Sequence, residues 1–196
     1  MKQFLSSLLL AVTLTVSQAA VAANPAGAKS FVDTLATQVL ALVKDEGVSA
    51  SDKKTKIESI FSDKVDIDFV AKFVLGKHWR AATPEQQTSY VGAYKPFILK
   101  NYAAKLTKYS GQTYTLKNAR ADGDASVVTM EINDPNGQKV NVDYKIKGDS
   151  NFKIIDIAVE GVSLLTTQRS EFNGIVERKG LDGLIDALKK QVAAKG

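Results

Sequence analysis

The segment KVNVDYKIK, residues 139–147, alternates apolar and polar side chains without a break. Alternation with a period of two predicts a β-strand that buries one face and exposes the other. The exposed face would carry the lysines together with one asparagine and one aspartate. The buried face would carry Val140, Val142, Tyr144 and Ile146.

Three more segments near this strand have the same period and predict strands, namely residues 113–120, 126–133 and 152–159. The connections between them are short and contain turn residues: ADGD at 121–124, DPNG at 134–137 and GDSN at 148–151. Connections of this length join antiparallel neighbours. The second half of the chain therefore predicts a four-stranded antiparallel meander.

The segments on both sides of the meander have helical spacing. Apolar residues recur at steps of three and four over residues 31–43, Ser51 is a candidate cap for a second helix, and Asp66 or Asp68 would begin a third that ends at Gly76. After the strands, residues 162–178 and 181–192 predict two helices separated by Lys179-Gly180. The pattern indicates an α+β domain, in which helices pack on one face of a four-stranded twisted antiparallel sheet.

The stretch LGKHWRAATPEQQ, residues 75–87, contains the only His and the only Trp of the chain and runs into a strong helix start. Thr83 is a good N-cap, Pro84 suits the first helical position, and Gln86 completes a capping box. We expect His78-Trp79-Arg80 to have a structural role, docking the turn before the helix or lying at a partner surface.

The helix that begins at Pro84 carries an aromatic stripe. Pro96 lies inside it and predicts a kink rather than two separate helices. We expect the stripe to oppose the sheet face that bears Val142 and Tyr144. Periodicity alone does not distinguish a filled core from a cavity there. The stripe consists of Tyr90, Tyr94, Ile98, Tyr102, Leu106 and Tyr109.

The first 22 residues have the form of a secretory signal peptide. Lys2 begins it, an apolar run follows, and Ala20-Val21-Ala22 provides a cleavage site. We therefore expect an exported, soluble protein that consists of one domain, residues 23–196. The sequence contains no cysteine, which excludes thiol catalysis and thiolate metal sites. The net charge of +5 fits attraction to anionic lipid or another anionic partner better than nucleic acid in an exported protein.

Catalytic patterns are scarce in this sequence. His78 could act as a lone general base, or it could be a packed or capping histidine. Asp143, Asp156 and Glu160 lie on or beside predicted strands and could hold a divalent cation, but their spacing matches no known metal-binding loop. The sequence therefore favours a binding protein over an enzyme.

Several segments resemble one family in order along nearly the whole chain after the leader. They are VLGKHWRAATPEQQ (74–87), YAAKL (102–106), ARADGDASVV (119–128), NVDYKIK (141–147) and VEGVSLLTTQRSEFNGIVERKGLDGLI (159–185). The chain resembles the toluene-tolerance (MlaC) family of periplasmic phospholipid-binding proteins of the maintenance-of-lipid-asymmetry pathway. Pro96 departs from what we expect of the family's helix.

The resemblance implies a periplasmic carrier that is not an enzyme. It would shuttle phospholipid between an outer-membrane lipoprotein complex and an inner-membrane ABC transporter complex with a substrate-binding ring. Phospholipid would be cargo, with no cofactor, metal or nucleic acid. A diacyl lipid has about 28 chain methylenes, each worth about 0.8 kcal/mol, so a carrier must enclose most of both chains.

The resemblance also implies a deep lipid pocket between sheet and helices. Two alternatives stay open: a periplasmic adaptor or chaperone with a filled core, and a hydrolase that depends on His78. We predict that the pocket is lined by apolar and tyrosine side chains on the predicted inward faces. These are Phe73, Val74, Tyr94, Ile98, Tyr102, Val128, Met130, Val142, Tyr144, Ile157, Val159 and Leu165.

Overall fold

The structure is a computed structural model that describes residues 23–106 and 111–194, without the side chains of residues 103–106. The predicted signal peptide, residues 1–22, lies outside the described residues, and so does Tyr109 of the aromatic stripe. No helix among the described residues is long and apolar enough to cross a membrane.

The sheet has five antiparallel strands in chain order: β1 (Thr113–Asp122), β2 (Ala125–Asn133), β3 (Lys139–Lys147), β4 (Lys153–Val159) and β5 (Val162–Ser163). The predicted meander is confirmed, and β5 is an addition to it. The sequence places Val162 in a helix, but positive φ angles at Glu160 (48°) and Gly161 (79°) reverse the chain there. Val162 then pairs with Val159 of β4.

The strand register places the apolar side chains of adjacent strands beside one another. Tyr144 of β3 lies opposite Val128 of β2 and Ile157 of β4. Met130 of β2 lies opposite Leu116 of β1 and Val142 of β3. Because directly opposed residues point to the same side of a sheet, these side chains form one apolar inner face. The predicted inward direction of β3 is confirmed.

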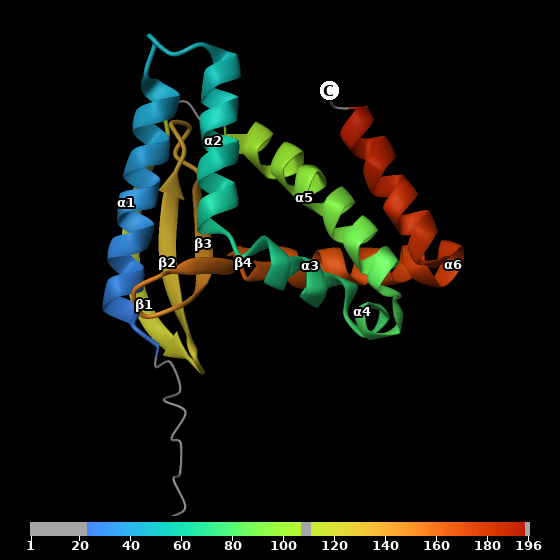
Figure 1. Ribbon diagram of the computed structural model, residues 1–196. Coiled ribbons are helices and arrows are strands. Elements are labelled where there is room, and N and C mark those ends of the chain that lie inside the picture. The colour runs from blue at the N-terminus through green and yellow to red at the C-terminus, as the bar shows by residue number, and fades with distance from the viewer. Residues whose placement is uncertain (1–22, 107–110, 195–196) are drawn as a thin grey trace, which may run out of the picture.

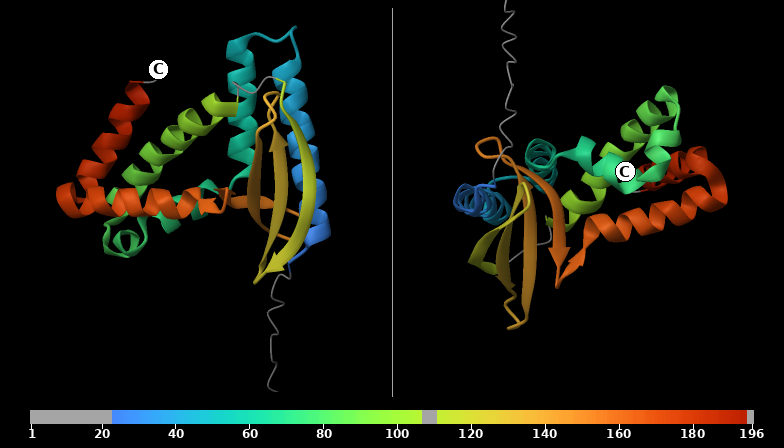
Figure 2. Two further views of the ribbon diagram at one scale, coloured as in Figure 1. Left: turned by 180° about the vertical axis from the view of Figure 1, so that it is seen from behind. Right: turned by 90° about the horizontal axis from the view of Figure 1, so that it is seen from below.

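The helices form two groups (Figures 1 and 2). The first two lie against the inner face of the sheet, and the other four gather beside it, while the view from behind shows the outer face uncovered. The fold class predicted from sequence therefore holds. The helices are α1 (Pro25–Lys44), α2 (Ala50–Lys64), α3 (Ile67–Leu75), α4 (Lys77–Ala81), α5 (Pro84–Leu106) and α6 (Leu164–Ala193).

Short polar side chains cap the beginnings of α1, α2, α3, α5 and α6. Ser49, not Ser51, caps α2 by accepting from the Asp52 N–H at 3.1 Å. Asp66 caps α3 by accepting from the Phe69 N–H at 3.0 Å. The predicted capping box before α5 is confirmed.

In that box the Thr83 hydroxyl accepts from the Gln86 N–H, and the Gln86 side chain accepts from the Thr83 N–H, both at 3.2 Å. The expected turn at His78-Trp79-Arg80 is instead the short helix α4. The Gln87 side chain donates to the Trp79 carbonyl at 2.9 Å and so docks α4 on α5.

Helix α5 does not cover the sheet face that bears Val142 and Tyr144, which corrects the expectation for its aromatic stripe. It packs on α6, α2 and α3, because α1 occupies the inner face over β1 and β2. The helix continues through Pro96 without interruption. The Tyr90 hydroxyl donates to the Ala71 carbonyl of α3 at 3.1 Å, and the Tyr94 hydroxyl donates to Gln168 Oε1 of α6 at 2.5 Å. The first half of the stripe thus lies in a helix–helix core.

Helix α6 is broken where the sequence predicts it. Gly180 has φ 72° and ψ 174°, far from helical values, and the chain changes direction there into two arms (Figure 1). The second arm lies along α5, where Lys100 Nζ donates to the Val192 carbonyl at 2.9 Å. Only a residue without a side chain adopts such a φ at little cost, which explains the glycine.

The buried tyrosines predict a loss of stability at alkaline pH. Burial raises the pKa values of Tyr90 and Tyr94 above the usual 10.0. Above about pH 10 the unfolded chain releases these protons while the folded chain retains them, so unfolding becomes easier by about 1.4 kcal/mol per pH unit for each tyrosine. Urea unfolding between pH 8 and 12 should show this fall, and Tyr90→Phe should make it less steep. If the free energy of unfolding fell equally steeply with pH in the variant and the wild type, Tyr90 would not contribute to the loss.

Candidate functional site

The main cavity lies between the α1–α2 pair and the inner face of the sheet, and its volume is about 150 Å³. Helix α1 contributes one long face to it because its apolar residues recur at steps of three and four. The cavity is lined by Val32, Leu35, Ala36, Val39, Leu40, Ile57, Ile60, Phe61, Lys64, Val65, Gln112, Thr113, Tyr114, Met130, Ile132, Tyr144, Ile154 and Ile157.

Polar groups at this cavity are few, and most are bound to other protein groups. The Tyr114 hydroxyl donates to Asp33 Oδ1 of α1 at 2.8 Å. Lys64 Nζ lies 2.8 Å from Oδ2 of the exposed Asp63 side chain. Lys64 therefore lines the cavity with its methylenes, while its ammonium group stays at the rim. Gln112 donates to Asp134 at 3.3 Å, and its Oε1 is buried with no partner among the described residues. The interior is therefore suited to hydrocarbon.

A second, smaller cavity of about 40 Å³ lies where β4, α2, α3, α5 and α6 meet. Its wall is mostly apolar, and the polar side chains in it are Tyr102, Gln168 and Asp156. Gln168 accepts from Tyr94, and Asp156 accepts from the Ser163 hydroxyl at 2.6 Å and the Leu165 N–H at 3.1 Å. The lining consists of Phe61, Val65, Val70, Ile98, Tyr102, Ile154, Ile155, Asp156, Ile157, Leu164, Leu165 and Gln168.

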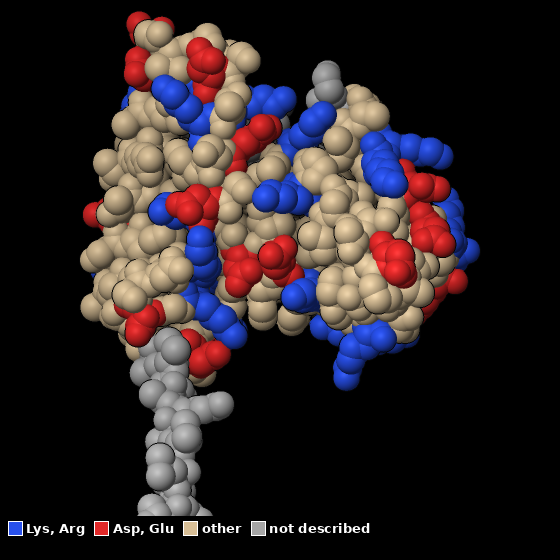
Figure 3. All heavy atoms as spheres, viewed as in Figure 1, with Lys and Arg blue, Asp and Glu red and all other residues tan. Residues whose placement is uncertain are grey.

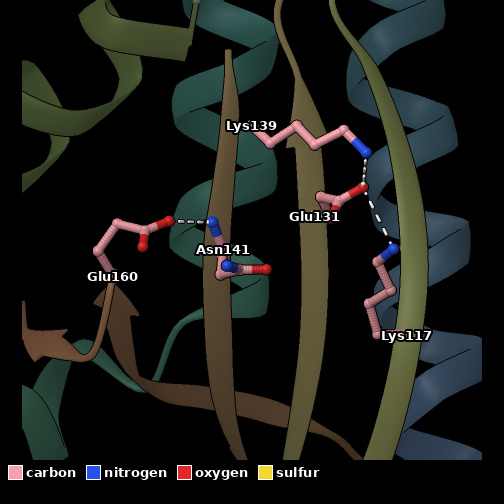
Figure 4. A network of polar contacts seen from close by, with 5 residues as sticks. All are labelled: Lys117, Glu131, Lys139, Asn141 and Glu160. Carbon is pink, nitrogen blue, oxygen red and sulfur yellow. Dashed lines mark hydrogen bonds and ion pairs between the residues drawn. The ribbon is translucent and has the colours of Figure 1, made fainter. Parts of the chain in front are cut away.

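The outer face of the sheet carries a polar network that fixes the register of β2 (Figure 4). Glu131 Oε1 lies 3.2 Å from Lys117 Nζ and 3.3 Å from Lys139 Nζ. A hydrogen bond from Lys117 is the largest cause that lowers the pKa of the Glu131 carboxyl, so it stays ionised. Because neighbouring residues point to opposite faces, anchoring Glu131 outside directs Met130 and Ile132 into the main cavity.

Comparison with known proteins agrees with this geometry. The family model described as "MlaC protein" matches residues 33–190, which is most of the chain. The chain belongs to the MlaC family. It is a family of phospholipid-binding transport proteins.

Two MlaC relatives are informative. One is the "Intermembrane phospholipid transport system binding protein MlaC" of Haemophilus influenzae, which is 24% identical over 135 residues. That match covers 66% of this chain and 63% of the relative, so it spans less than two thirds of the relative's length. The other is a solved phospholipid-binding protein from Ralstonia solanacearum in complex with a phospholipid. It is 28% identical, with a TM-score of 0.73, and the match covers 86% of this chain and 98% of that one.

The structure places six of the twelve predicted lining residues at a cavity of this MlaC-family fold. Met130 and Tyr144 line the main cavity, and Ile157 lies between the two cavities. Three more line only the second cavity: Ile98, Tyr102 and Leu165.

The other six line neither cavity. Phe73 is 37% exposed, with the Arg169 guanidinium 5.0 Å above its ring. Tyr94 is held by Gln168 in the helix–helix core, because α5 does not cover the sheet. The remaining four are packed inside the helices or the sheet: Val74, Val128 and Val142 are buried, and Val159 is half-buried at the end of β4.

Sequence reasoning missed the contribution of α1 and α2 to the main cavity. The apolar spacing of α1 was recognised, but the same spacing describes a helix on a filled core. Ala36 is one available signal, because a small residue in the middle of an otherwise bulky apolar face leaves space opposite the sheet.

The candidate metal ligands make local hydrogen bonds, and the candidate base lines neither cavity. Asp143 accepts from the Thr129 hydroxyl at 2.6 Å, Asp156 binds the start of α6, and Glu160 accepts from the Asn141 N–H at 2.5 Å (Figure 4). No group of three His, Asp or Glu side chains in residues 23–106 and 111–194 could hold a metal ion. His78 is half-buried on α4, and its Nε2 makes no hydrogen bond within that same part of the chain.

Charge on the face shown in Figure 3 is mixed, with acidic and basic side chains interspersed over both groups of helices. The net charge of +5 is therefore not gathered into one basic field on this face. Attraction to an anionic partner would act through local groups rather than through the whole surface.

Proposed function

We propose that this protein is a soluble periplasmic phospholipid carrier without catalytic activity. Residues 1–22 would be removed as a signal peptide, and residues 23–196 would form a single phospholipid-binding domain. The observation that carries the proposal is the apolar cavity enclosed by α1, α2 and the inner sheet face in a chain of the MlaC family. Phospholipid is the cargo rather than a cofactor.

The cavity volume indicates how loading must proceed. An apolar cavity of about 150 Å³ holds a molecule of the size of benzene. Two acyl chains with about 28 methylenes need several times that space. Loading therefore requires the α1–α2 pair and the sheet to move apart, while the head group stays in water at the rim.

The proposed partners are an inner-membrane ABC transporter complex with a substrate-binding ring and an outer-membrane lipoprotein complex. A surface that supports docking lies on α3, α4 and α6. There Arg169 covers the exposed ring of Phe73, and Lys72 Nζ lies 5.5 Å from the centre of the Trp79 ring. Exposed aromatic and arginine side chains are the types enriched at the centres of protein interfaces.

Mass spectrometry tests the proposed function directly. Gently purified protein, denatured in the instrument, should release at least about one phospholipid molecule per chain. Incubation with phospholipid vesicles should refill protein that has been stripped with detergent. A protein that carries no phospholipid on purification and takes none from vesicles would contradict the proposal.

A further inference from the structure

The two cavities are neighbours that share one wall. Four residues line both of them: Phe61, Val65, Ile154 and Ile157. Phe61 is the only aromatic residue of the four, and its ring stacks on the Tyr102 ring with centroids 6.2 Å apart and planes 8° from parallel. Tyr102 lines only the second cavity. The stacked pair therefore stands at the boundary between the two spaces.

The rest of the wall is fixed by backbone contacts. Val65 forms a parallel bridge with Ile154, and the Asp66 N–H donates to the Ile154 carbonyl at 3.0 Å. Ile154 and Ile157 belong to β4, which pairs with β3. Phe61 has the largest side chain of the four, it is half-buried, and its ring can change rotamer while the backbone contacts of the wall stay in place.

Beyond Phe61 the second cavity combines apolar side chains with a few polar ones. Two of its polar side chains are bound to protein groups, Gln168 to Tyr94 and Asp156 to Ser163. A hydrocarbon chain that passes Phe61 would contact apolar side chains of this cavity, such as Ile98 and Leu165.

We infer that Phe61 is the specificity-determining residue for acyl-chain length. With its ring on Tyr102, the main cavity ends at Phe61 and a chain stops there. With the ring turned away, the cavities join and a longer chain extends into the second one, between α5, α6 and β4. This inference rests on the proposed function, because it assigns a role within the same lipid site.

The expected effect follows from burial of methylenes. A methylene is already buried in the vesicle, so each one that the carrier leaves in water disfavours uptake of that lipid by about fourfold. Phe61→Ala removes a benzene ring from the wall, so the bound lipid should shift to chains longer by about two or more carbons. Phe61→Trp should shift it to shorter chains.

The experiment loads stripped protein from vesicles that contain equal amounts of phosphatidylglycerols differing only in chain length, and mass spectrometry reads the bound species. Phe97→Ala is the matched control, because Phe97 is buried against Tyr94 and Phe172 and lines neither cavity. It should keep the wild-type chain-length profile. Because either alanine variant could unfold, Phe61→Leu and Phe97→Leu form a milder pair, each checked for a cooperative melt.

The outcomes separate the two proposals. If wild-type protein binds phospholipid but Phe61→Leu keeps the wild-type chain-length profile, the assignment of Phe61 is wrong and the proposed function stands. An equal shift in the Phe97 variants would also overturn it, because the effect would then follow from general loosening. If wild-type protein binds no phospholipid at all, the proposed function fails and this inference fails with it.

Discussion

Replacing Ala36 by phenylalanine should abolish lipid retention while leaving the fold intact. Ala36 is half-buried on α1 and lines the main cavity, which has a volume of about 150 Å³. A benzene ring fills such a space, so the new side chain would occupy the position of an acyl chain. We expect bound phospholipid to fall by at least about tenfold and the free energy of unfolding to change by no more than about 1–2 kcal/mol.

Mass spectrometry of the purified variant measures the lipid, and urea unfolding measures the stability. Ala41→Phe is the matched control, because Ala41 is exposed on the same helix and does not line the cavity. It should retain wild-type lipid. Lipid at wild-type stoichiometry in a folded Ala36→Phe protein would show that the cargo binds elsewhere.

Asp156→Ala should lower the free energy of unfolding more than removal of a carboxylate on the outer face of the sheet. Its Oδ1 accepts from the N–H groups of Ile157 and Leu165 at 2.8 and 3.1 Å, and its Oδ2 accepts from the Ser163 hydroxyl at 2.6 Å. These bonds join β4 to the beginning of α6. Their removal takes this acceptor away from the N–H groups of Ile157 and Leu165, so we expect a loss of about 2–4 kcal/mol.

Urea unfolding compares this variant with Asp143→Ala, which removes one hydrogen bond, to Thr129, on the outer face of the sheet. The loss for Asp143→Ala should be about 1 kcal/mol. Asp156→Asn should recover part of the lost stability, because it keeps an acceptor oxygen. Equal losses for the two alanine variants would mean that Asp156 does not hold α6 in place.

The local parts of this fold could be predicted from the sequence. Alternation gives the strands and the inward direction of Tyr144, because both depend on neighbouring residues only. The capping box at Thr83 and the break at Gly180 are equally local. The position of α5 could not be predicted, because an aromatic stripe has the same spacing whether it packs on a sheet or on the helices α3 and α6.

The difference between local pattern and long-range packing also explains which residues of the candidate site could be predicted. Met130 and Ile157 could be identified because a strand's period shows which face is inward. The residues of α1 could not, since a helix that lines a cavity and one that covers a filled core have the same pattern. Asp156 was a candidate cation ligand because its hydrogen-bond partners become adjacent only after the turn at Glu160-Gly161 forms.

The break in α6 has a consequence for the association of one chain with another. At Gly180 the second arm turns back, so that Leu184, Ile185 and Leu188 are buried in the core of their own chain. In a straight helix of the same length this apolar arm would project away from its own α5 and would be free to pack on the α5 of a second copy, which is the geometry of a domain-swapped dimer. The glycine at this position therefore favours a closed monomer over exchange of the C-terminal arm.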